Sequence, residues 1–309
     1  MNKSGLAKQQ IEVVMADPKK SLATNIPGNF FVDSTCIDCD TCRQLAPRTF
    51  ADNGDYSSVY CQPETAEEVV AALQALVSCP TASIGTRDKT DPKPAIASLP
   101  LAIEEPVFYC GFNSEKSYGG NSFFIQHKSG NWLVDSPRFT AQLVKKFREM
   151  GGIKYVFLTH RDDVADAEQY AKEFGASRII HSRDASAAPG AEIIFDGTEE
   201  SELVPGFKLI PTPGHTAGHA VLLFDNKFLF TGDHLAFDRE AKRLMAFRDY
   251  CWYSWPEQTK SMESLLKYSF EYVLAGHGDR VRLERKEMKA QLEQLVERMK
   301  LSKKDWPAA

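Results

Sequence analysis

The stretch C36-I-D-C39-D-T-C42 decides how the first part of this 309-residue chain folds. Two residues separate its successive cysteines, so one loop can wrap three thiolates around a single inorganic centre. A fourth cysteine, Cys79, stands directly before Pro80 and can close the cage from a distant part of the chain. The spacing therefore predicts that this segment folds around a bound inorganic cofactor.

This cysteine pattern resembles that of the bacterial-type ferredoxins, whose thiolates hold a [4Fe–4S] cluster. Ala46 stands where two-cluster members have a further cysteine, so the resemblance, over residues 29–85, implies a single cluster. Zinc is the alternative, although zinc sites usually pair two separate C-x2-C knuckles. A disulfide network fits poorly with seven cysteines in 309 residues. The expected cluster ligands are Cys36, Cys39, Cys42 and Cys79.

Composition and charge limit the possible classes of protein. The chain is 43% hydrophobic with a net charge of −5, which argues against a nucleic-acid partner. It has no apolar stretch long enough to cross a membrane and no signal-peptide pattern, so we expect a cytoplasmic protein. Residues 30–85 carry a net charge of −6. This acidity would steer a redox partner protein toward the segment, or it is only a solvated surface.

The length predicts more than one domain. Residues 1–28 are polar and interrupted by prolines, which predicts an irregular lead-in. Residues 29–85 form the expected ferredoxin-like domain. Residues 86–104 are rich in proline and charge and are expected to be an extended linker. Residues 105–309 form a second domain.

Strand and helix patterns alternate in this second domain. The runs 121–127 and 131–135 predict a β-hairpin. Residues 139–150, 163–174 and 285–300 have helical spacing. The chain is therefore expected to be of the α+β class, with its elements stacked in layers.

Polar side chains follow the predicted strands where each strand ends. They are Asp135, His160, His215, Asp233 and His277. Strand ends carry the loops on which binding residues usually lie. Imidazole and carboxylate groups are the ligands that zinc and iron accept, so these residues predict a metal site.

The order of these residues resembles the metallo-β-lactamase superfamily, which implies an αββα sandwich with metal at one sheet edge. The matching motifs are Asp135, T159-H160, P213-G-H-T-A-G-H219, T231-G-D233 and His277. The third and fourth motifs are closest to the glyoxalase II branch. The resemblance implies that His160, His215 and Asp233 bind one zinc or iron ion.

The second motif departs from the family pattern T-H-x-H-x-D-H. Val164 and Ala165 replace two of its ligands, and Asp162 replaces its second histidine. Asp162 remains a possible further ligand and, with Asp233, a catalytic candidate that would orient an attacking water molecule.

The departure also weakens the second metal position of the family. At that position only His277 and a bridging Asp233 remain as possible ligands, so we expect a mononuclear centre. Asp163 and Asp166 are out of register and are expected to stabilise a helix start, unless a shift of the loop recruits one of them.

Three functions from different classes follow. The first is a metal-dependent hydrolase of a small molecule, with the cluster as an accessory electron carrier. The second is an iron oxidoreductase that the cluster supplies with electrons. The third is a non-catalytic redox or regulatory protein, in which the metal position is empty.

Overall fold

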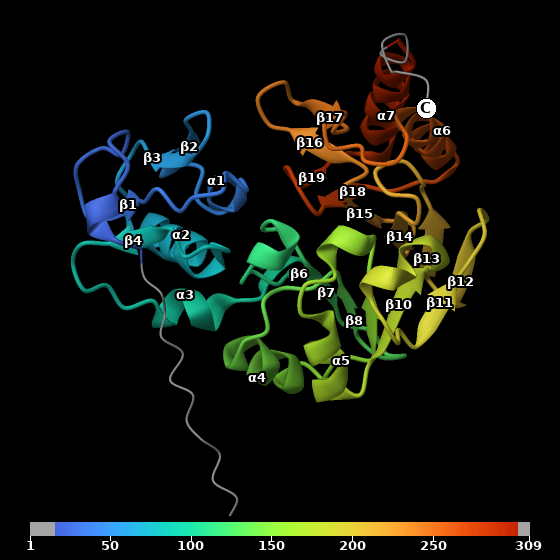
Figure 1. Ribbon diagram of the computed structural model, residues 1–309, viewed down its shortest axis with the longest axis horizontal. Coiled ribbons are helices and arrows are strands. Elements are labelled where there is room, and N and C mark those ends of the chain that lie inside the picture. Colours follow the sequence, from blue (N-terminus) through green and yellow to red (C-terminus); the bar gives the residue numbers. More distant parts are fainter. Residues whose placement is uncertain (1–15, 302–309) are drawn as a thin grey trace, which may run out of the picture.

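A computed structural model describes residues 16–301 of the chain. The chain forms two units that lie side by side (Figure 1). The smaller unit contains the cysteine stretch. Within the expected lead-in, residues 1–15 lie outside the described part, and residues 16–28 include a short 3-10 helix, η1 (Pro18–Lys20).

The N-terminal unit combines two small antiparallel sheets with three helices. Strand β1 pairs with β4, and β2 pairs with β3. Helix α2 begins at a capping box formed by Thr65 and Glu68, and it ends at Cys79. The elements are β1 (Phe30–Val32), α1 (Thr41–Leu45), β2 (Phe50–Asp52), β3 (Ser57–Val59), α2 (Ala66–Ser78), β4 (Ile84–Thr86) and α3 (Lys93–Ser98).

The expectation of an extended linker is wrong for most of its length. Helix α3 (Lys93–Ser98) and strand β5 (Leu101–Glu104) lie within it. Helix α3 packs on the N-terminal core through the buried Ala95, whereas β5 is the edge strand of the first large sheet. The boundaries of the two domains otherwise remain predictions.

Two large sheets form the second unit. The first has the strand order β11-β10-β9-β8-β7-β6-β5 and the second β12-β13-β14-β15-β18-β19. The remaining strands of the first are β6 (Val107–Tyr109), β7 (Phe123–Ile125), β8 (Trp132–Val134), β9 (Tyr155–Phe157), β10 (Ser177–His181) and β11 (Ile193–Phe195). The second contains β12 (Ser201–Val204), β13 (Phe207–Pro211), β14 (Ala220–Phe224), β15 (Phe228–Gly232), β18 (Tyr272–Ala275) and β19 (Val281–Arg282). A separate hairpin joins β16 (Ala236–Asp238) to β17 (Arg243–Met245).

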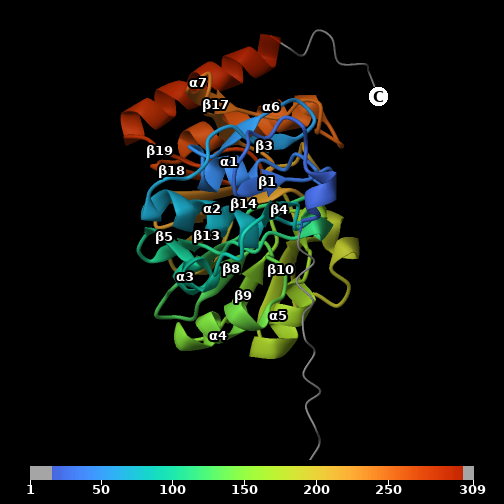
Figure 2. The same cartoon turned by 90° about the vertical axis from the view of Figure 1, so that its left-hand side faces the viewer.

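Three apolar layers hold this unit together. The central layer lies between the two sheets and includes the stacked rings of Trp132 and Phe207. Helices α4 (Ala141–Glu149) and α5 (Ala167–Phe174) cover the first sheet, and α6 (Trp255–Ser264) and α7 (Arg285–Leu301) cover the second (Figure 2). The predicted αββα sandwich is confirmed.

The predicted hairpin and helices are present, with one informative difference. Strands β7 and β8 pair antiparallel as expected. The helix expected from residue 163 begins instead at Ala167, because residues Arg161–Asp163 form a separate 3-10 helix, η3. Asp163 therefore does not lie at the start of an α-helix, contrary to the sequence-based expectation.

Polar contacts, one of them buried and two partly buried, join the two units. Asn113 donates through Nδ2 to Thr41 Oγ1 at 3.0 Å. Arg239 pairs with Asp40 at 2.8 Å, and Arg138 donates to the carbonyl of Val77 at 3.2 Å. These contacts fix the cysteine loop against the edge of the sandwich. None of the helices between residues 16 and 301 has the length and apolar content that crossing a membrane requires.

Candidate metal centre and cluster site

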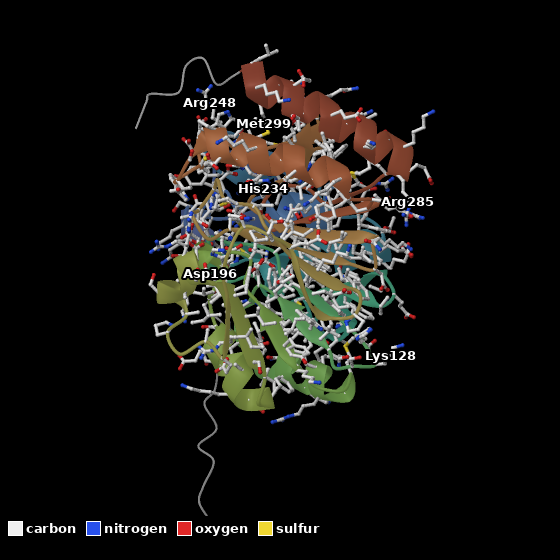
Figure 3. All side chains as sticks on the ribbon, turned by 90° about the vertical axis from the view of Figure 1, so that its right-hand side faces the viewer. Lys128, Asp196, His234, Arg248, Arg285 and Met299 are labelled. Carbon is white, nitrogen blue, oxygen red and sulfur yellow. The ribbon has the colours of Figure 1, made fainter. Side chains whose placement is uncertain are left out.

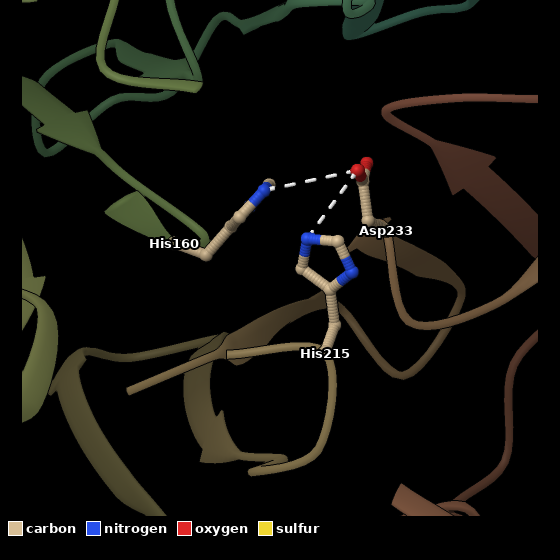
Figure 4. A group of neighbouring side chains, drawn as sticks. All are labelled: His160, His215 and Asp233. Atoms are coloured by element: carbon tan, nitrogen blue, oxygen red, sulfur yellow. Dashed lines mark ion pairs between the residues drawn. The ribbon is translucent and has the colours of Figure 1, made fainter. Parts of the chain in front are cut away.

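Three of the predicted ligands converge at one edge of the sandwich (Figure 4). His160 follows β9, His215 follows β13 and Asp233 follows β15. Asp233 Oδ2 lies 3.8 Å from His160 Nε2 and 3.6 Å from His215 Nε2. All three residues form a group whose ligand atoms lie within 4.8 Å of one another.

These separations fit ligands of a shared ion better than direct hydrogen bonds. Two ligand atoms that each lie about 2.1 Å from a tetrahedral ion are about 3.4 Å apart. His160 Nδ1 is engaged with Thr159 Oγ1 at 3.0 Å, so its Nε2 is directed to the centre. The Nε2 atoms of His160 and His215 are buried without hydrogen-bond partners. The residues present therefore fit a bound metal ion.

The electrostatics also suit metal binding. Burial lowers the pKa of His160 to about 4, because the charged imidazolium loses its hydration. Although burial opposes it, the neighbouring imidazoles of His277, His160 and His215 lower the pKa of Asp233. The site thus favours neutral imidazole and ionised carboxylate, which are the ligating forms.

Asp162 lies at the open side of this centre. Its Oδ2 atom is 3.5 Å from His215 Nε2 and 3.9 Å from His160 Nε2, and its side chain is 46% exposed. The adjacent His215 imidazole lowers the pKa of Asp162. An ionised, half-exposed carboxylate at this place can contact both an ion and a bound molecule.

A second group adjoins the first. Asp163, Asp233 and His277 also bring their ligand atoms within 4.8 Å of one another. Asp233 belongs to both groups, and its Oδ2 lies 4.0 Å from His277 Nε2. His277 follows β18, as the sequence pattern predicted.

Two other acidic side chains of this region have structural partners. Asp135 accepts hydrogen bonds from the Thr159 amide at 2.8 Å and hydroxyl at 3.0 Å, and burial raises its pKa to about 8. Asp166 accepts from Lys116 Nζ at 2.6 Å and from the Phe139 amide at 2.8 Å. Neither belongs to the two groups of potential ligands.

Asp184 is a positioning residue that the sequence reasoning missed. Its carboxylate accepts from the amide of Arg161 at 3.1 Å, the hydroxyl of Thr216 at 2.5 Å and the amide of Gly218 at 3.1 Å. It thereby ties the loop after His160 to the loop that carries His215. In the sequence, the only sign of this role is that Asp184 is an acidic residue shortly after a short predicted strand.

Two further buried histidines, His219 and His234, lie close to the metal-binding group. His219 Nδ1 is engaged with Thr212 Oγ1 at 2.9 Å, whereas both ring nitrogens of His234 lack partners. His234 lies beneath α6, where Gln258 donates to its carbonyl (Figure 3). Burial lowers the pKa of His234 to about 3.

This shift predicts a specific pH dependence for His234→Leu. Between pH 6.5 and about 3 the unfolded chain binds a proton at His234 that the folded chain does not, so stability falls as pH falls. From pH 6.5 to pH 5, the wild type should lose about 2 kcal/mol more stability than the variant. Urea unfolding at the two pH values measures this. An identical pH dependence in the two proteins would contradict the assignment.

The four cysteines line one small cavity in the N-terminal unit. A single zinc ion with sulfur ligands at about 2.3 Å would bring the sulfur atoms within about 3.8 Å of one another. Among residues 16–301, the groups of three ligand atoms within 4.8 Å contain no cysteine. No three of the four sulfur atoms therefore lie within 4.8 Å of one another, which is wider than a single zinc ion requires. None of the seven cysteines, all of which lie within residues 16–301, forms a disulfide, and burial raises the pKa of the Cys39 thiol to about 12.

Two adjacent glycines separate the cysteine loop from the metal centre. A Cβ atom on Gly119 would lie 2.9 Å from Cys39 Sγ, and one on Gly120 would lie 2.9 Å from Asp163 Oδ1. Because consecutive Cα atoms are about 3.8 Å apart, Cys39 Sγ and Asp163 Oδ1 are no more than about 13 Å apart. Thr41 Oγ1 also donates to the Gly119 carbonyl at 3.3 Å.

This close packing gives a testable consequence for Gly119→Ala. The added methyl group would overlap Cys39, so the variant should hold clearly less acid-labile sulfide per chain than the wild type. Gly175→Ala is the matched control, since φ is also positive there but a Cβ atom meets nothing within 4 Å. Both variants should lose about 1 kcal/mol to backbone strain. Equal sulfide content in the two variants would refute the contact.

A cavity of about 1230 Å³ lies between the two units and reaches both sites. Cys39 lines it from one side, and Asp162, His215, Asp233 and His277 line it from the other. Exposed aromatic side chains surround its mouth, namely Tyr60, Tyr118, Tyr250 and Trp252. The backbone amide of Trp252 donates to the carbonyl of His215 at 2.9 Å. The stretch Y250-C-W-Y-S-W255 divides between cavity and core: Tyr250 and Trp252 line the cavity, whereas Cys251 and Trp255 are buried.

Comparisons with known proteins agree with this architecture. Residues 32–86 match the 4Fe-4S single cluster domain of Ferredoxin I, and residues 102–299 match the metallo-beta-lactamase superfamily. The chain therefore belongs to the metallo-beta-lactamase superfamily, and it carries a single-cluster ferredoxin domain at its N-terminal side.

Curated relatives match a part of the chain. The uncharacterized protein YmaE of Bacillus subtilis is 30% identical over 122 residues, which cover 38% of this chain and 44% of that protein. A hydroxyacylglutathione hydrolase of Acidiphilium cryptum is 30% identical over 118 residues, 37% of this chain and 48% of its own length. The chain thus spans about half the length of the curated relatives it matches.

A solved structure shares the fold. The crystal structure of the DIM-1 metallo-beta-lactamase superposes with a TM-score of 0.51 at 19% identity and covers 65% of this chain and 95% of that one. At this identity the similarity concerns the fold alone.

Proposed function

We propose that this chain is a metal-dependent oxidoreductase in which the [4Fe–4S] cluster and the metal centre serve one small-molecule substrate. The observation that carries this proposal is the shared cavity, whose wall includes Cys39 as well as His215, Asp233 and His277. Hydrolysis transfers no net electrons and needs no electron carrier, so the placement of the cluster beside the metal centre favours electron transfer.

The separation of the two sites supports the proposal. Cys39 packs against Gly119, and Asp163 packs against Gly120. These two glycines are adjacent in the same chain. Cys39 Sγ thus lies no more than about 13 Å from Asp163, whose carboxylate lies within 4.8 Å of that of Asp233, and this short path favours electron transfer between the two sites. No second copy of the chain is needed to bring the sites together.

The ligands suit a redox metal. His160, His215 and Asp233 would hold the ion, and two imidazoles with one carboxylate are the set that non-haem iron(II) enzymes use. Such an ion would bind a small molecule at its open positions and exchange electrons with it. Asp162 is placed to orient that molecule or to accept a proton from it, since its ionised carboxylate lies at the open side.

The cavity lining favours a partly apolar substrate with an anionic group. Tyr250 and Trp252 present exposed rings whose centroids lie 6.0 Å apart. Arg161 lines the same cavity beside Asp162 and could pair with an anion. The electron donor would be a partner protein that approaches the acidic N-terminal unit.

A metal-dependent hydrolase remains the second candidate function. The motif P213-G-H-T-A-G-H219 and the similarity to hydroxyacylglutathione hydrolases favour it. In this case a zinc ion at the same ligands would assist hydrolysis of an ester or thioester. The metal that the purified protein retains distinguishes the two functions.

The metal content of the protein and the rate at which its extra iron is reduced test the proposal. Protein purified without oxygen should contain about five or more irons and about four acid-labile sulfides per chain. A small protein reductant should reduce the extra iron at least ten times faster in the wild type than in Cys42→Ser, which lacks the cluster. Cys61→Ser is the matched control, because Cys61 is exposed and outside the cluster site. Equal rates, or zinc in place of the extra iron, would overturn the oxidoreductase.

A further inference from the structure

We infer that Asn113, a residue of the second unit, raises the reduction potential of the cluster by directing the hydroxyl of Thr41 to the sulfur of Cys39. Thr41 lies in the cysteine loop directly before Cys42, whereas Asn113 follows β6 in the sandwich. This role requires the cluster but not the metal-dependent reaction proposed above, so either can fail without the other.

The three side chains form a chain of contacts across the boundary between the units. Asn113 Nδ2 donates to Thr41 Oγ1 at 3.0 Å, and Thr41 Oγ1 lies 3.4 Å from Cys39 Sγ. Thr41 and Asn113 are 2% and 0% exposed. Because both are buried, these contacts are made without competition from bulk water and are electrostatically stronger than at the surface.

The amide of Asn113 can adopt one orientation only. The Gly119 carbonyl cannot donate, so the amide nitrogen must face it, and Nδ2 donates to this carbonyl at 2.7 Å. The hydroxyl of Tyr109 donates to Asn113 Oδ1 at 2.7 Å. Burial raises the pKa of Tyr109, which keeps this hydroxyl protonated. The second proton of Nδ2 is thereby directed to Thr41.

The single hydroxyl proton of Thr41 is then left for another acceptor. Two acceptors are near, the Gly119 carbonyl at 3.3 Å and Cys39 Sγ at 3.4 Å. The carbonyl already accepts the shorter bond from Asn113. A cysteine that binds a metal is deprotonated, and hydrogen bonds to ionised acceptors are about twice as strong as those to neutral ones. The proton of Thr41 therefore points to Cys39 when the cluster is bound.

A hydrogen bond to Cys39 makes the cluster easier to reduce. The cluster gains one electron on reduction, so the negative charge on its thiolates grows, and a donor stabilises the reduced state more than the oxidised one. The same preference acts on the free thiol. Burial raises the pKa of Cys39 to about 12, and the side chain and backbone of Thr41 oppose this rise.

Reduction potentials of Thr41→Val and Thr41→Ser test the hydroxyl. Valine has nearly the volume of threonine but no hydroxyl, whereas serine keeps it. In an anaerobic titration with dithionite as electron donor, Thr41→Val should shift the reduction equilibrium about tenfold toward the oxidised cluster, which is about 59 mV for one electron. Thr41→Ser should keep the wild-type potential. Thr49→Val is the control, since Thr49 is buried in the same unit but outside the cavity that the four cysteines line. A wild-type potential in Thr41→Val would overturn the inference.

Asn113→Leu tests the part played by the second unit. Without the amide, the Gly119 carbonyl becomes free to accept the proton of Thr41, so the potential should fall although Thr41 is present. The double variant with Thr41→Val should fall no further than Thr41→Val alone, because both changes remove one hydrogen bond. Asn113→Asp, which keeps the shape of the side chain and offers Thr41 an acceptor, should also lower the potential and replaces Asn113→Leu if that variant loses acid-labile sulfide. A wild-type potential in the Asn113 variant, or additive falls in the double variant, would refute the role of Asn113 and leave the proposed function standing.

Discussion

His215→Ala should remove the metal ion next to His160 and Asp233 while the iron–sulfur cluster remains. His215 supplies one of three buried ligands, and its Nε2 atom has no hydrogen-bond partner that would compensate for the loss. The affinity for the ion should fall by more than about 100-fold, since even removal of a residue that only orients a ligand costs 10- to 100-fold. Metal analysis after dialysis against a weak chelator, with acid-labile sulfide measured in parallel, gives the result.

His127→Gln is the control for this variant. His127 packs by its ring against Phe207 and lies outside the candidate ligand groups. It should keep both the extra metal and the cluster. Retention of the extra metal by His215→Ala at wild-type affinity would show that the histidine is no ligand.

Cys42→Ala should abolish the cluster and destabilise the N-terminal unit. Cys42 is buried in the small core of that unit, so the free energy of cluster binding is also free energy of folding. Loss of the brown absorbance should accompany a fall of at least about 10 °C in the melting temperature of this unit, because about 2 kcal/mol already corresponds to that shift in a domain of its size. Anaerobic circular dichroism and visible absorbance follow both changes.

Cys61→Ala provides the comparison for Cys42→Ala. Cys61 is exposed, and its thiol donates a hydrogen bond to the Gln62 carbonyl at 3.7 Å. This variant should keep its colour and its melting temperature. A brown Cys42→Ala protein with four irons and four sulfides would exclude Cys42 as a ligand.

Much of this architecture could be predicted from the sequence. The spacing of Cys36, Cys39 and Cys42 indicated the cluster domain, because few cofactors need three thiolates from one loop. In the second domain, β13, β15 and β18 run in the same direction, so the residues after them meet at one sheet edge. For this reason the pattern of histidines and acids at strand ends could indicate a common site.

Features that depend on local backbone geometry could not be predicted. Pro92 and Pro94 favour an extended segment in the sequence, yet proline is tolerated in the first turn of a helix, and helix α3 begins at these residues. Asp163 was assigned to a helix start, since nothing in H160-R-D-D-V-A-D166 announces the 3-10 turn that directs it inward. The approach of Gly119 to Cys39 joins distant parts of the chain and has no sequence signal.

The central claim is that the cluster and the metal centre lie close enough to act together. The most direct measurement is electron paramagnetic resonance of the singly reduced, iron-loaded protein, compared with His215→Ala. We predict that the signal of the reduced cluster is broader and relaxes faster in the wild type, because a paramagnetic ion lies nearby. Identical line shape and relaxation in the two proteins, with both centres shown present in the wild type by metal analysis, would contradict the account.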